Sequence, residues 1–160
     1  MSRLLRMPEA GSLAVHAAVL LAESPGRRVP VRALAKELEA SQAHLAKVMQ
    51  WLAKGGLVAS RRGPRGGFTL ARPADRISLL EVYEAVEGTV KVGGCVFGRP
   101  VCGRSECLFG ELVGEFESEF LLYLANTSLA ALARRRVPAR RRARGTGGQG
   151  TRDGAKEAVR

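Results

Sequence analysis

Residues 32–70 combine two short amphipathic segments with a glycine-rich turn, an order that few folds accommodate. Arg32–Leu38 and Gln42–Lys54 each carry apolar residues at helical spacing, and only a tight connection separates them. Ser41 is a favoured helix N-cap, and Gly55-Gly56 ends the second segment. The pattern predicts a helix-turn-helix, whose second helix would enter the major groove of DNA. The side chains expected at that surface are Ser41, Gln42, Ala43, His44 and Lys47.

A basic hairpin is predicted directly after the helix pair. Leu57–Arg61 alternates as a strand, a turn rich in glycine and proline follows, and Phe68–Leu70 returns as a second strand. A hairpin in this place makes the predicted fold a winged helix. Its arginines can enter a minor groove, where the negative potential is strongest. They are Arg61, Arg62 and Arg65.

The formal net charge of +11 on 160 residues is distributed in blocks. Counted along the chain, residues 27–76 carry +8, residues 77–133 carry −5 and residues 134–160 carry +8. The first basic block coincides with the helix pair and the hairpin, which favours a polyanionic partner for this module. The second is rich in Arg, Gly and Ala and almost lacks large apolar residues, so we expect a disordered basic tail over 134–160. A protein that coats nucleic acid through this tail is a further hypothesis.

Helices are also expected on both sides of the winged helix. Glu9–Glu23 has apolar residues near helical spacing, and Ser78 with Glu81 forms a capping box for a helix that ends at Glu87-Gly88. Ser105–Asn126 is a long acidic helix with a continuous apolar stripe, which a second copy of the chain would cover. We therefore predict a mainly α fold with a small β-hairpin: a winged helix-turn-helix domain over 1–88 and a dimerisation helix region over 105–133.

Three cysteines, Cys95, Cys102 and Cys107, lie in the segment 89–110 between the capped helix and the long helix. No stretch is long and apolar enough for a membrane span, and we expect a cytoplasmic protein, in which disulfides are rare. Thiolates bind zinc and iron–sulfur clusters, although structural zinc usually takes four ligands and C-x2-C pairs. From spacing alone, an iron–sulfur cluster, a zinc ion, and thiol chemistry without a ligand all remain open.

The ordered motifs resemble a known family. They are His44–Val48, Leu52–Val58, Arg62–Phe68, Leu70–Pro73, Ile77–Leu79, Glu84–Gly88 and the three cysteines. This combination, over about residues 8–133, is similar to the winged-helix iron–sulfur regulators that include the nitric-oxide-sensing NsrR and the cluster-assembly regulator IscR. The resemblance implies a homodimeric transcription factor with a 2Fe-2S or 4Fe-4S cluster on the cysteines. It also implies that Arg62 enters the minor groove and that Ser41, Gln42, Ala43 and Lys47 begin the recognition helix.

The fourth bond to such a cluster is open. In the cluster-assembly branch a histidine follows the third cysteine by three residues, and Gly110 stands there in this chain. In the nitric-oxide branch an aspartate near the start of the partner's first helix supplies the bond, and Ser12 stands at that place. The candidates are Glu9, Ser12 or His16 from the partner subunit, or an exogenous thiol or water. The chain also differs from the cluster-assembly branch at position 46, where Ala46 stands in place of a glutamate that reads bases. We therefore expect its operator sequence to differ from that of the cluster-assembly branch.

Together these features predict a DNA-binding transcriptional regulator, acting as a repressor on a pseudo-palindromic operator in double-stranded DNA. An iron–sulfur cluster that senses nitric oxide, redox state or iron–sulfur status would control its affinity. The alternative is a winged-helix regulator that uses cysteine thiols or zinc without a redox-active cluster. An enzyme is not expected, because the sequence has no nucleophile–base set, no Walker-type loop and no H-E-x-x-H motif.

Overall fold

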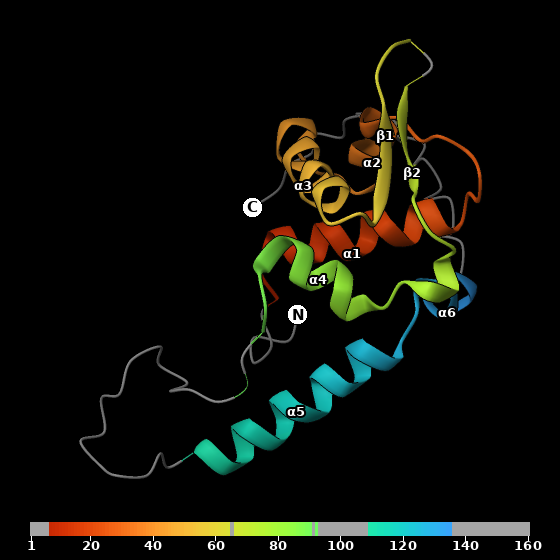
Figure 1. Cartoon of the computed structure of the whole chain (residues 1–160). Helices are drawn as coiled ribbons and strands as arrows, with labels where there is room; N and C mark the ends of the chain where they lie inside the picture. The colour runs from red at the N-terminus through yellow and green to blue at the C-terminus, as the bar shows by residue number, and fades with distance from the viewer. Residues whose placement is uncertain (1–6, 65, 91, 93–108, 136–160) are drawn as a thin grey trace, which may run out of the picture.

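The computed structural model describes residues 7–64, 66–90, 92 and 109–135, and it is mainly helical with one antiparallel hairpin (Figure 1). This confirms the predicted fold class. In chain order the elements are α1 (Glu9–Ala22), α2 (Val31–Glu37), α3 (Gln42–Lys54), β1 (Val58–Arg61), β2 (Gly67–Leu70), the 3-10 turn η1 (Ala74–Arg76), α4 (Leu79–Glu87), α5 (Gly110–Asn126) and α6 (Leu129–Arg135). None of the described helices is long and apolar enough to cross a membrane.

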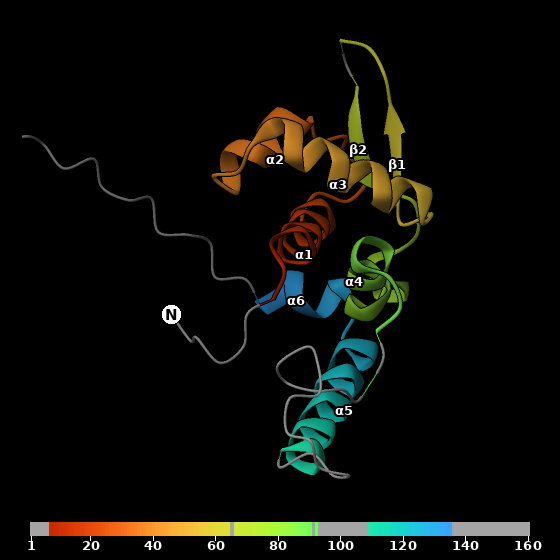
Figure 2. The same cartoon turned by 90° about the vertical axis from the view of Figure 1, so that its left-hand side faces the viewer.

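Helix α1 lies at the centre of the fold. Helices α2 and α3 and the hairpin lie on one side of it, and α4 and α6 lie on the other (Figures 1 and 2). Its buried face consists mostly of small side chains, Ala14, Ala17 and Ala18, which allow neighbouring helices to approach closely, with Leu21 buried at its end. The larger buried side chains of the other elements fill the space around it, and burying each contributes roughly 1.5–3 kcal/mol. These include Leu34, Leu45, Met49, Leu52, Ile77 and Leu129.

The turn between α2 and α3 has the geometry that the helix-turn-helix prediction requires. Helix α2 begins at Val31 after Pro30, one residue earlier than predicted, and ends at Glu37. Glu39 adopts φ +52°, and the backbone N–H of Ala40 donates to the carbonyl of Ala35 at 2.9 Å. The chain therefore reverses within a few residues, and α3 covers the range predicted from the sequence.

The hairpin is fixed to the start of the helix pair. In β1–β2, Val58 pairs with Leu70 and Arg61 pairs with Gly67. Phe68 also exchanges two backbone hydrogen bonds of 2.9 Å with Val29, just before α2. A Cβ on Gly67 would lie 2.7 Å from the Val29 carbonyl oxygen, so a residue with a side chain does not fit there. The wing thus has a defined position relative to the helices.

Within the predicted dimerisation region over 105–133 the structure describes two helices, and α5 ends at Asn126, where the sequence analysis ended the long helix. Backbone bonds of 2.9 Å run from Leu79 N–H to the Thr127 carbonyl and from Leu129 N–H to the Ile77 carbonyl, and they interrupt the helix. Helix α5 extends away from the domain on one side of this junction, whereas α6 packs against α1 (Figure 1). Helix α6 reaches Arg135, so its last two residues belong to the predicted tail. Residues 105–108 and 136–160 lie outside the described residues.

Candidate nucleic-acid interface and cysteine segment

The recognition helix α3 separates its residues by exposure. Leu45, Val48, Met49 and Leu52 are buried, so the rest of the helix forms one outward surface. Of the predicted contacts, His44 is partly buried and the others are exposed: Ser41, Gln42, Ala43 and Lys47. The hydroxyl of Ser41 also accepts from the His44 N–H at 3.5 Å, which is long for a hydrogen bond.

The exposed face of α3 continues further along the helix than the predicted contacts. Gln50 and Lys54 are exposed, and Trp51, the single tryptophan of the chain, is 43% exposed. Trp51 was missed by the sequence reasoning. Its position four residues after Lys47 places it on the same face, so helical spacing could have identified it.

The wing contributes positive charge. Arg61 and Arg62 are exposed, and neither α3 nor the two strands contains an acidic residue. Arg65 lies outside the described residues.

An open cleft of about 270 Å³ separates the wing from the start of the helix pair. Its lining includes Arg32 of α2, which the sequence reasoning did not select, together with Gln42 and Arg61. The remaining lining residues are Pro30, Val31, Gly63, Gly66, Gly67 and Phe68. No local sequence pattern marks Arg32 as a binding residue. It lies beside the wing only because the hairpin pairs with the segment before α2.

Helix α1 carries the three candidates for the fourth ligand, and its first turn contacts the recognition helix. The carboxylate of Glu9 lies 3.7 Å from Nδ1 of His44. His16 Nδ1 makes a 2.7 Å hydrogen bond with the carbonyl oxygen of Ser12, one turn away. All three candidates therefore lie in α1, and Glu9, whose side chain is 79% exposed, also lies close to α3.

The same turn of α1 also contacts the end of α4. The backbone N–H of Gly11 donates to Oε1 of Glu87 at 2.8 Å, and a Cβ on Gly11 would lie 2.8 Å from the Tyr83 ring. Burial, with the nearby charge of Glu87, raises the pKa of Tyr83. The chain leaves α4 at Glu87 toward the cysteine segment. Cys95, Cys102 and Cys107 lie outside the described residues, so their shared site stays a prediction.

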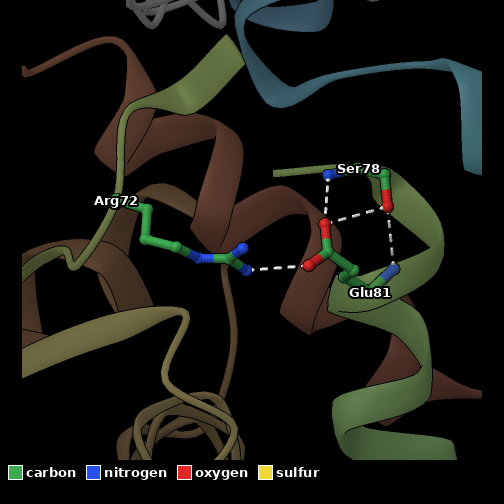
Figure 3. Close-up of polar contacts among 3 residues, drawn as sticks. All are labelled: Arg72, Ser78 and Glu81. Atoms are coloured by element: carbon green, nitrogen blue, oxygen red, sulfur yellow. Dashed lines mark hydrogen bonds and ion pairs between the residues drawn. The ribbon is translucent and has the colours of Figure 1, made fainter. Parts of the chain in front are cut away.

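A polar network connects the exit of the wing with the start of α4 (Figure 3). The Ser78 hydroxyl accepts from the Glu81 N–H at 3.2 Å, and the Glu81 carboxylate accepts from the Ser78 N–H at 2.9 Å, which confirms the predicted capping box. Arg72, two residues after β2, donates to the same carboxylate at 2.8 Å. The Ser78 backbone hydrogen bond and then Arg72 hold the pKa of Glu81 below its usual value.

A recognition helix followed by a basic wing defines a winged helix-turn-helix regulator of transcription, a class that binds DNA. Residues 7–135 match the Rrf2 family model, described as an iron-dependent transcriptional regulator, and the chain belongs to this family. This confirms the resemblance drawn from the motifs, and the relatives are regulators, not enzymes.

Two kinds of relatives are similar to the chain. The regulator IscR of Xenorhabdus nematophila is 33% identical over 132 residues, which are 81% of this chain and 80% of that protein. Among solved structures, CymR, the global cysteine regulator of B. subtilis, has a TM-score of 0.69 at 23% identity, over 83% of this chain and 99% of that one. IscR of T. potens has a TM-score of 0.64 at 24% identity, over 82% and 88%. At 23% and 24% identity, these two solved structures show only that the chain shares their fold.

Proposed function

We propose that the protein is a cytoplasmic repressor that binds a pseudo-palindromic operator as a homodimer and responds to the state of an iron–sulfur cluster. In each chain, α3 enters a major groove and the wing contacts the adjacent minor groove. The proposed contacts are Ser41, Gln42, Ala43, His44 and Lys47 on the helix and Arg61, Arg62 and Arg65 on the wing. The exposure of all the described members except His44, which is partly buried, and the lack of acidic residues on α3 and both strands support this assignment.

The outer face of α5 supports the homodimer. Phe116 and Phe120 stack with ring centroids 6.3 Å apart and stay 43% and 38% exposed. Leu112 and Tyr123 continue the same face at helical spacing, 67% and 48% exposed. A contiguous apolar surface of this kind is typical of a protein–protein interface. We assign it to a second copy of the chain, which would give two recognition helices related by two-fold symmetry.

Cys95, Cys102 and Cys107 would hold the cluster, and the chemistry of the donor set fits it. Three thiolates suit iron–sulfur ligation, and a fourth bond from oxygen or nitrogen leaves one weaker position. We assign that bond to Glu9, Ser12 or His16 of the partner subunit, or to an exogenous thiol or water. The cluster would supply a group that reacts with nitric oxide or oxidants.

The contacts of the first turn of α1 support the proposal that the cysteine segment controls DNA binding. The turn bonds Glu87, where the chain departs for the cysteines, and it pairs with His44 on the recognition helix. A shift of the cysteine segment that moves the end of α4 would therefore also move α1 and, through α1, α3. If Glu9 is the fourth ligand, its contact with His44 is lost when that bond forms.

Anaerobic purification tests the cluster assignment. We expect coloured protein that contains iron and acid-labile sulfide, and exposure to nitric oxide should change its DNA affinity by about 5- to 150-fold, the usual range of allosteric coupling. Cys102→Ser should lose the colour and the response, while Ser118→Ala, on the exposed surface of α5, should keep both. Colourless anaerobic protein without iron or sulfide would contradict the proposal.

A regulator that uses zinc or free thiols is the second candidate, and Gly110 favours it. This residue stands where the cluster-assembly branch has a histidine ligand, so one of the known ligand sets is incomplete. Metal analysis separates the candidates. Zinc near one per chain, with DNA affinity that does not respond to nitric oxide, would support the second candidate and exclude the first.

A further inference from the structure

The cleft between the wing and α2 places two arginines at one opening. Arg32 lies in the first turn of α2 and Arg61 at the end of β1, 29 positions apart in the chain, and both line the cleft of about 270 Å³. The pairing of Val29 with Phe68 fixes their elements side by side, because Val29 lies three residues before Arg32 and Phe68 follows the glycine that pairs with Arg61. The opening is therefore part of the folded framework.

The cleft has positive charge that the described residues do not neutralise. None of its nine lining residues is acidic, and none of the described ion pairs involves Arg32 or Arg61. Gly63, Gly66 and Gly67 form part of the wall without side chains, so a ligand can approach the backbone closely. Guanidinium groups match the planar, bidentate geometry of phosphate oxygens.

The position of the cleft identifies which phosphate fits. Gln42, the first residue of α3, lines the same opening and belongs to the proposed base-reading surface. A DNA strand that borders the major groove occupied by α3 would therefore bring its backbone to the cleft.

We propose that Arg32, together with Arg61, binds a backbone phosphate of this strand and sets the register of α3 in the groove. The inference rests on the proposed DNA-binding surface. Arg32 would contribute affinity without base preference, since phosphate contacts carry no direct sequence information.

Salt dependence measures such a contact. Each phosphate neutralised by a protein cation adds about 0.9 to the slope of log K against log salt, so its loss costs about eightfold in affinity at 0.1 M salt. The probes are a duplex selected by the wild-type protein from a random pool and an unrelated duplex of equal length, with anisotropy read at several KCl concentrations. The full-length chain is used throughout.

For each chain bound, we expect Arg32→Ala to weaken binding to both duplexes by the same factor of about eight and to lower the slope by about 0.9. Arg32→Lys keeps the charge and should restore the slope. Lys36→Ala, an exposed lysine of the same helix that does not line the cleft, is the matched control. A change in slope no larger than that of Lys36→Ala, or a loss confined to the selected duplex, overturns the inference. Failure of the wild-type protein to select any sequence would instead refute the proposed function.

Discussion

Replacing Ser78 with alanine removes the N-cap of α4, and its effect on stability can be estimated from the contacts. The hydroxyl accepts from the Glu81 N–H at 3.2 Å and lies 3.1 Å from the Glu81 carboxylate. Without it, an amide of the first helical turn loses its acceptor. Loss of a serine N-cap costs about 1 kcal/mol. For a chain of this size, that corresponds to a fall in Tm of about 2–4 °C.

Thermal unfolding followed by far-UV circular dichroism measures this fall. The matched control is Ser118→Ala, because the Ser118 hydroxyl is exposed in the middle of α5 and, among the described residues, donates to the Gly114 carbonyl within its own helix. Alanine is the better helix former there, so the control should not lower Tm. Equal Tm values for the two variants would refute the assignment of Ser78 as a stabilising cap.

Glu81, the capping-box partner of Ser78, makes the stability of the folded protein depend on pH. The pKa of Glu81 is lowered from 4.5 in the folded protein by the Ser78 backbone and Arg72. Below pH 4.5 the unfolded state therefore binds more protons than the folded state, so the stabilisation is present above pH 4.5 and is lost as pH falls through the folded pKa. Glu81→Gln should lose less stability than the wild type between pH about 5 and 3. Parallel curves in urea unfolding over this range would contradict the argument.

Three further predictions concern the wing, α5 and the C-terminal residues. Gly67→Ala places a Cβ 2.7 Å from the Val29 carbonyl oxygen at a residue with φ +148°. We expect the free energy of unfolding in urea to fall by about 1–3 kcal/mol and DNA binding to weaken. Unchanged values would show that the wing is not fixed at this residue. Phe116→Asp should produce a monomer in sedimentation, whereas a dimer would refute the α5 interface. Truncation after Arg135 removes eight basic and two acidic residues. It should preserve sequence-specific binding while reducing its salt slope, and complete loss of binding would instead support the nucleic-acid-coating hypothesis.

Local patterns predicted the elements whose signals lie within a few residues. The range Gln42–Lys54 follows from Ser41 at its start and Gly55 at its end, and Ser78 with Glu81 marks the start of α4. Helix caps and hairpin turns are short-range hydrogen-bonding and steric requirements, so one segment is enough to reveal them. The end of the long helix at Asn126 was also predicted, but the backbone bonds that join the following residues to Ile77 and Leu79 were not, because those partners are about fifty residues away.

The amino-acid sequence by itself determined the winged-helix order, the basic face of the recognition helix and the presence of three thiols in one segment. Only the tertiary structure decided which distant groups meet: Arg32 beside Arg61, Glu9 beside His44, and α6 against α1. The reason is that capping and periodicity are read within one segment, whereas these contacts depend on strand pairing and helix packing between segments far apart in the chain.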